Sequence, residues 1–174
     1  MRTWLMCLVV CCGSIAIVAE SAAGITWTAP AGWTSQRARP MRAATYAIAP
    51  VAGDKSETEC AVYFFGAGQG GSADANITRW KEQFTLANGA PAAAKVAKRV
   101  VQGLPVTTID VSGNYSGLGA PLAASASVSD YRLLGAIVEA PGGNIFVKCT
   151  GPMKTIAGNQ PKFEQLLASM RPAR

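Results

Sequence analysis

Residues 59–80, ECAVYFFGAGQGGSADANITRW, constrain the fold more than any other stretch of the sequence. The first part, residues 60–65, is a short apolar run rich in aromatic side chains, which predicts a core strand. A glycine-rich loop occupies residues 66–71, and Ser72 or Asp74 can then cap a helix. A strand, a tight loop and a helix are therefore expected one after another.

The predicted helix runs over residues 75–87. Ile77, Trp80 and Phe84 recur at the spacing i, i+3, i+7, which places their side chains on one helix face. The Asn-Gly pair at residues 88–89 is a typical helix stop. We therefore expect one amphipathic helix in the middle of the chain.

The glycine-rich loop matches the G-x-G-x-x-G pattern of dinucleotide-binding sites, in which phosphate lies at the N-terminus of the following helix. Such a unit continues with an acidic residue about 20 positions further on, but here the first acid at the end of a predicted strand is Asp110. A structural turn is therefore favoured, and contact with a small anion or a partner is the alternative. The residues of that alternative site are Gly66, Gly68, Gly70, Gly71, Arg79 and Lys81.

Residues 1–23 are typical of a secretory signal peptide. Arg2 supplies the positive start, residues 5–19 are mostly apolar, and small residues occupy positions −3 and −1 of a cut after Ala23. The apolar run is shorter than the roughly 20 residues that span a membrane, which disfavours an uncleaved anchor. We expect an exported protein, periplasmic or extracellular, with a single domain over residues 24–174 and no membrane span after processing.

Of the five cysteines, only Cys60 and Cys149 lie beyond the predicted signal peptide. Both sit in apolar runs that predict strands, and exported proteins commonly oxidise such a pair. A disulfide between Cys60 and Cys149 is therefore predicted. The alternative is a pair of buried free thiols in neighbouring strands.

The chain contains no histidine, which excludes Ser-His-Asp and Cys-His catalysis and every histidine-ligated zinc site. No metal site, cofactor or catalytic residue is predicted, and the chain is not expected to be an enzyme. The net charge is +6, which favours weak attraction to anionic surfaces. The basic residues are only loosely clustered and lack interleaved aromatics, so nucleic acid is not an expected partner.

Lys148, Lys154 and Tyr115 are candidates for the polar rim of a pocket, although solvated surface is the favoured interpretation. Glu57 and Glu59 lie two residues apart before a predicted strand. Nothing else in the sequence marks them as a carboxylate pair of the glycosidase kind.

The remaining pattern predicts strands joined mostly by hairpins. The turns are Gln-Gly-Leu-Pro at residues 102–105 and Pro-Gly-Gly at residues 141–143, each between apolar runs. Residues 112–129 are rich in glycine, alanine and serine and predict a long surface loop. A second helix is expected over residues 160–170, with Asn159 as its cap.

The C-terminal helix carries an apolar stripe, formed by Phe163, Leu166, Leu167 and Met170, that is typical of core packing. Together these elements predict an α+β fold with a largely antiparallel, twisted sheet, a mid-chain helix and a C-terminal helix.

Two short motifs resemble the PsbP/Mog-type α-β-α sandwich, which includes the DcrB-like bacterial envelope proteins. They are Pro30-x-Gly32-Trp33 near the start and Phe163-x-x-Leu166-Leu167-x-Ser169-Met170 at the end. The resemblance spans residues 27–170 in element order. It implies helices packed on a twisted antiparallel sheet, a non-enzymatic accessory or binding role, and no catalytic set.

The sequence therefore predicts an exported, non-catalytic accessory or binding protein of the cell envelope. Its partner would be an unknown envelope protein or a small anionic ligand. The alternatives are a small exported hydrolase that lacks histidine and a structural domain that oligomerises through a sheet edge.

Overall fold

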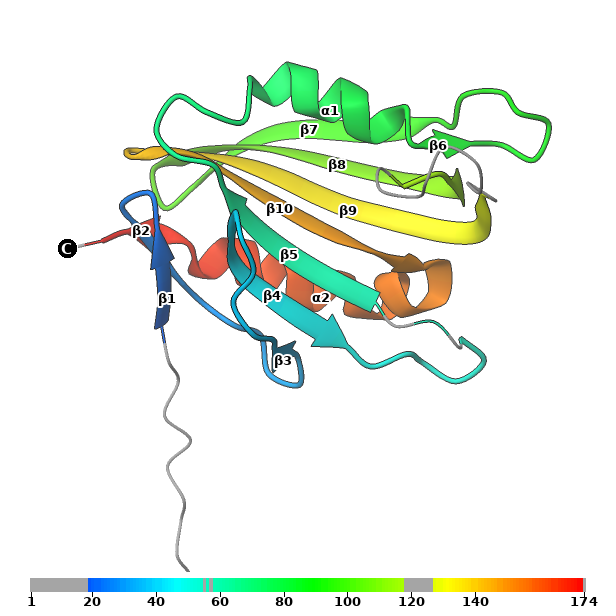
Figure 1. The fold of residues 1–174 in the computed structure, drawn as a ribbon, viewed down its shortest axis with the longest axis horizontal. Coiled ribbons are helices and arrows are strands. Elements are labelled where there is room, and N and C mark those ends of the chain that lie inside the picture. Colours follow the sequence, from blue (N-terminus) through cyan, green and yellow to red (C-terminus); the bar gives the residue numbers. More distant parts are fainter. Residues whose placement is uncertain (1–18, 55, 57, 118–126, 174) are drawn as a thin grey trace, which may run out of the picture.

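The computed structural model describes residues 19–54, 56, 58–117 and 127–173 (Figure 1). In chain order the strands are β1 (Ala19–Ala22), β2 (Ile25–Thr28), β3 (Thr34–Ser35), β4 (Arg42–Ile48), β5 (Thr58–Phe64), β6 (Phe84–Thr85), β7 (Ala94–Val101), β8 (Leu104–Tyr115), β9 (Val128–Ala140), β10 (Gly143–Pro152) and β11 (Arg171–Pro172), and the helices are α1 (Ala73–Lys81) and α2 (Met153–Ser169).

The main sheet is eight-stranded and antiparallel in each of its pairings, in the order β3-β4-β5-β10-β9-β8-β6, with β7 also paired to β8. A second sheet of three strands has the order β1-β2-β11. Long hairpins join β7 to β8 and β9 to β10, as the turn residues predict. The predicted α+β fold with a largely antiparallel sheet is confirmed.

The two helices cover opposite faces of the main sheet (Figure 1). Successive side chains of a strand point to opposite faces, so Val147 and Cys149 of β10 join the cluster under α2. Phe146, one residue before Val147, joins the cluster under α1 with Ile77 and Trp80. The result is an α-β-α arrangement with one core on each side of the sheet.

Cys60 of β5 and Cys149 of β10 lie directly opposite one another in the antiparallel ladder. Their sulfurs are bonded, which confirms the predicted disulfide. Both side chains are buried under α2. The bond therefore joins two neighbouring inner strands of the sheet.

Helix α1 ends earlier than predicted. Ser72 is its cap and accepts a hydrogen bond from the Ala75 amide at 3.2 Å. The helix stops at Lys81, and Phe84 lies in the short strand β6 opposite Tyr115. The prediction that Phe84 continues the helix was wrong because pairing with β8 also buries this side chain.

Helix α2 begins earlier than predicted, at Met153, and Pro161 lies inside it. The start is fixed from a distant loop: the Asp54 carboxylate accepts from the Thr155 amide at 2.9 Å and from its hydroxyl at 2.6 Å. Asn159 is therefore not a cap. Its amide oxygen instead accepts from the Trp33 indole at 2.9 Å, which holds α2 against the Pro-x-Gly-Trp turn.

Strands β8 and β9 extend into the segment predicted as a surface loop, because β8 reaches Tyr115 and β9 begins at Val128. The centre of that segment, residues 118–126, lies outside the described residues.

Most of the predicted signal peptide, residues 1–18, also lies outside the described residues. The predicted cut after Ala23 remains a prediction, and residues 19–22 form strand β1 in this structure. Among the residues described, no helix is long and apolar enough to cross a membrane.

Candidate functional site

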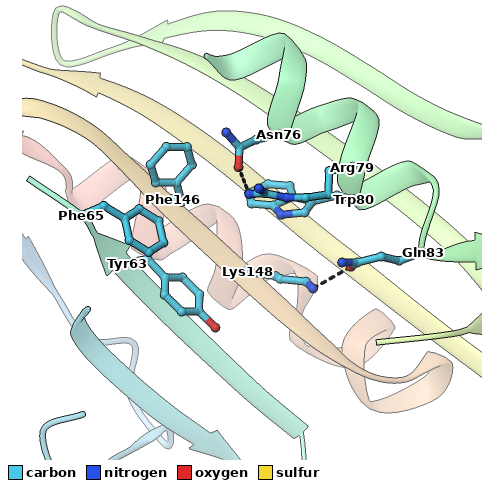
Figure 2. A pocket seen from close by; sticks show the side chains of 8 residues that line it. All are labelled: Tyr63, Phe65, Asn76, Arg79, Trp80, Gln83, Phe146 and Lys148. Atoms are coloured by element: carbon cyan, nitrogen blue, oxygen red, sulfur yellow. Dashed lines mark hydrogen bonds between the residues drawn. The ribbon is translucent and has the colours of Figure 1, made fainter. Parts of the chain in front are cut away.

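A pocket opens between helix α1, the C-terminal end of strand β5 and the middle of strand β10 (Figure 2). It encloses about 200 Å³. We call it the α1 pocket, and its lining residues are Tyr63, Phe65, Asn76, Arg79, Trp80, Gln83, Phe146 and Lys148.

Trp80 forms one wall because strand β9 carries a glycine beneath it. A Cβ atom at Gly135 would lie 2.6 Å from the Trp80 ring and 2.8 Å from Ile109. No side chain fits there without displacing the indole. Gly135 therefore fixes how closely α1 approaches the sheet.

The glycine-rich loop supports the opposite wall. A Cβ atom at Gly70 would lie 2.6 Å from Phe146 and 2.7 Å from Phe65. The Asn76 amide of α1 donates to the Gly70 carbonyl at 2.8 Å, which ties the loop to the helix. Positive φ angles at Gly66, Gly68, Gly70 and Gly71 explain why this loop is rich in glycine.

Lys148 is the main charged group of the α1 pocket. Its ammonium donates to the Gln83 side-chain oxygen at 2.8 Å and to the Tyr115 hydroxyl at 3.2 Å. It also lies 5.4 Å from the centre of the Tyr115 ring. These partners are neutral, and no ion pair among the described residues includes Lys148.

Burial, and to a lesser extent the neighbouring Arg79 guanidinium, lower the pKa of Lys148 from its ordinary value to about 8. Arg79 is held at the pocket by a hydrogen bond to the Asn76 side chain (Figure 2). Two cationic side chains thus line one small cavity. Burial also raises the pKa of Tyr115, so its hydroxyl stays neutral at physiological pH.

The rest of the wall is aromatic. The rings of Tyr63 and Phe65 stack with centres 5.9 Å apart, and Phe65 meets Phe146 with centres 5.5 Å apart. The lining residues include no carboxylate and no thiol. Within the described part of the chain, no group of three potential metal-ligating side chains exists.

Of the predicted anion-site residues, Arg79 lines the α1 pocket, whereas Lys81 and the loop glycines do not. The loop glycines instead support the pocket wall through Gly70. Lys148 and Tyr115, considered as a pocket rim, do meet. Lys154 lies apart from them, exposed on the first turn of α2.

Tyr63, Phe146 and Gln83 were not predicted as pocket residues. One signal in the sequence was available: Lys148 interrupts an otherwise apolar strand, between Val147 and Cys149. A lysine at such a position must either reach solvent or have a specific partner.

Comparison with known proteins identifies the fold. The structure is similar to cyanobacterial PsbP from Synechocystis, with a TM-score of 0.55 and 13% identity over 95% of this chain and 99% of that one. It is also similar to a protein of unknown function from Pseudomonas aeruginosa, with a TM-score of 0.51 and 10% identity over 91% and 98% of the two chains. This chain has a PsbP-like fold.

No family model and no curated protein matches the chain. The likeness to solved structures is therefore one of architecture across nearly the whole length. It confirms the resemblance drawn from the Pro-x-Gly-Trp and C-terminal helix motifs. The role of this PsbP-like chain has to be inferred from its own pocket.

Proposed function

We propose that this protein is a non-catalytic binding protein of the cell envelope, and that the α1 pocket takes a small organic anion with a flat apolar body. The main support is the Lys148 ammonium, which is half-buried beside an aromatic ring with neutral partners only. A buried charge without a counter-charge is unfavourable. A carboxylate or a similar anion in the pocket would compensate both Lys148 and Arg79.

The aromatic wall indicates the remainder of the ligand. Tyr63, Phe65, Phe146 and Trp80 offer ring faces and edges against which a planar group can pack. The cavity of about 200 Å³ is smaller than the roughly 300–1,000 Å³ typical of pockets for drug-sized ligands. A ligand of one ring with one anionic group fits these limits.

Export is supported by the signal-like pattern of residues 1–23 and by the disulfide, since disulfides persist mainly in oxidising compartments. A non-catalytic role is supported by the pocket lining. A hydrolase that lacks histidine would need convergent carboxylates for general acid-base chemistry, and the lining residues include none.

Calorimetric titration with benzoate and benzamide tests the binding proposal. The two probes have the same size and shape and differ in charge. At pH 6.5 we expect saturable binding of benzoate and about tenfold or more weaker binding of benzamide, because a hydrogen bond to a charged group contributes about 1.5–3 kcal/mol. The Lys148→Met variant should lose the preference for benzoate.

The matched control is Lys95→Met, which removes an exposed lysine of β7 and keeps the net charge equal to that of Lys148→Met. It should bind benzoate like the wild type. Equal affinity for the two probes, or unchanged benzoate binding in Lys148→Met, would contradict an anion site at the α1 pocket. Fractionation of expressing cells tests the location separately, and recovery in the cytoplasm alone would contradict export.

A further inference from the structure

Residues 19–28 form a complete hairpin. Strand β1 pairs with β2 so that Ala22 lies opposite Ile25. The two connecting residues, Ala23 and Gly24, have φ angles of 51° and 76°. Positive φ at both positions is the requirement of a two-residue type I′ turn. An alanine adopts this conformation only where its surroundings enforce it.

This turn is held by the turn between β9 and β10 and by the C-terminal residues of the chain. The Gly142 amide donates to the Ala23 carbonyl at 2.9 Å, and the Ala173 amide donates to the Gly24 carbonyl at 2.9 Å. A Cβ atom at Gly142 would lie 2.8 Å from the Ala23 carbonyl atoms, so the two turns are in close contact. Figure 1 shows the β1–β2 hairpin beside the C-terminal strand.

The side chain of Glu20 reaches two buried groups. Its carboxylate accepts from the Trp27 indole at 2.9 Å and from the Tyr46 hydroxyl. Trp27 and Tyr46 are 1% and 0% exposed. The Trp27 indole also donates to the Tyr46 oxygen at 2.8 Å, so Glu20 is the acceptor for the Tyr46 proton. Burial, and then the hydrogen bond to Glu20, raise the pKa of Tyr46.

We propose that the leader is cut before Glu20, and that the β1–β2 hairpin remains in the mature protein. The proposal rests on the export stated above and changes the position of the cut predicted after Ala23. A cut after Ala23 would remove the acceptor of Tyr46 and the carbonyl that receives the Gly142 amide. It would also expose the edge of β2. Ala19 supplies a small residue at −1 of a cut before Glu20, with Ile17 at −3, and a cut three residues earlier has the small residues Ser14 and Ala16 at −3 and −1.

The direct test is the N-terminus of the protein recovered from the envelope fraction, read by intact mass and N-terminal sequencing. We expect a chain that begins at Glu20 or a few residues before it. A chain that begins at residues 21–24 overturns the proposed cut and leaves export intact. A chain that keeps Met1 overturns both the cut and the removal of a leader.

A pair of variants gives a second test. Asparagine is not a small residue, so it blocks a cut directly after itself, and it tolerates the positive φ of a type I′ turn. Ala23→Asn should therefore be processed at the wild-type rate, since Asn-Gly is the preferred pair in this turn. Loss of processing in Ala23→Asn overturns the proposal. Ala19→Asn should slow processing or move the cut.

Thermal unfolding of the mature protein tests the contacts of Glu20. Glu20→Ala should lower Tm by several degrees, because it leaves the buried Tyr46 hydroxyl without an acceptor. The control is Glu139→Ala, at an exposed position of β9. Equal Tm values for the two variants overturn the inference that β1 is part of the folded domain.

Discussion

Replacing Lys148 by methionine should stabilise the protein at neutral pH while it removes anion binding. Methionine keeps the length of the aliphatic stem and removes the buried charge. The pKa of Lys148 is lowered to about 8 in the folded protein, from 10.5 for an ordinary lysine. At 1.36 kcal/mol for each pH unit between the two pKa values, burial and the nearby Arg79 together make the Lys148 charge unfavourable by about 3 kcal/mol.

The sign follows from proton counts in the two states. Below about pH 8 both the folded and the unfolded protein carry the Lys148 proton, so the full cost is present. Between about pH 8 and 10.5 the unfolded chain holds the proton and the folded protein does not, so the free energy of unfolding rises with pH. The methionine variant lacks this rise.

Methionine also leaves the Gln83 oxygen without its donor, which costs about 1 kcal/mol. The net expectation is a gain of about 2 kcal/mol at pH 7 that falls and reverses sign as the pH approaches 10. Urea unfolding at several pH values, followed by far-UV circular dichroism, measures it. Lys95→Met should change little at any pH. A Lys148→Met variant that is less stable than the wild type at pH 7, or a difference that does not depend on pH, would refute the reasoning.

Three further outcomes are expected. Gly70→Ala should destabilise the fold by roughly 2–4 kcal/mol, because the new methyl group would collide with Phe146. Gly68→Ala, with open space around it, should cost only about 1–2 kcal/mol. Equal losses in urea unfolding would contradict the packing of the loop. Asp54→Ala should cost about 0.5–2 kcal/mol through the lost cap of α2, and an unchanged urea midpoint would contradict that role. Titration of the unfolded, unreduced mature protein should find no free thiol, and reduction should lower stability by up to about 4.6 kcal/mol on the chain-entropy estimate.

The sheet and the disulfide were predictable because their signals are local. Apolar runs bounded by glycine and proline turns specify hairpins, and Cys60 and Cys149 both lie in such runs. Their direct opposition in the ladder was not predictable, since register between distant strands depends on the whole sheet. Alternation along the strands then decides which residues face α2 and which face α1.

The start of α2 could not be read from the sequence. Pro161 and Asn159 match the pattern of a helix start, but the cap comes from Asp54, about 100 residues away in the chain. A tertiary hydrogen bond therefore overrides a good local signal. The contacts of β1 are also tertiary. The Glu20 carboxylate accepts hydrogen bonds from Trp27 and Tyr46, which are both buried in the core.

The end of α1 explains why the pocket was not predicted. An apolar residue at i+7 from Ile77 favours a continued helix, and the sequence offers Phe84 there. In the structure Phe84 leaves the helix and packs on Tyr115, with ring centres 5.0 Å apart. Gln83 is then buried beside the sheet, where its side-chain oxygen meets the Lys148 ammonium at 2.8 Å.

The early end of α1 and the register of β10 together shape the pocket. The helix packs on β8 and β9, and the cavity lies beside it, over the end of β5 and the middle of β10 (Figure 2). Lys148 must also point into that cavity, because Cys149 beside it is fixed on the opposite face by the disulfide. The anion site thus depends on a helix end and a strand register, and both are set by tertiary contacts.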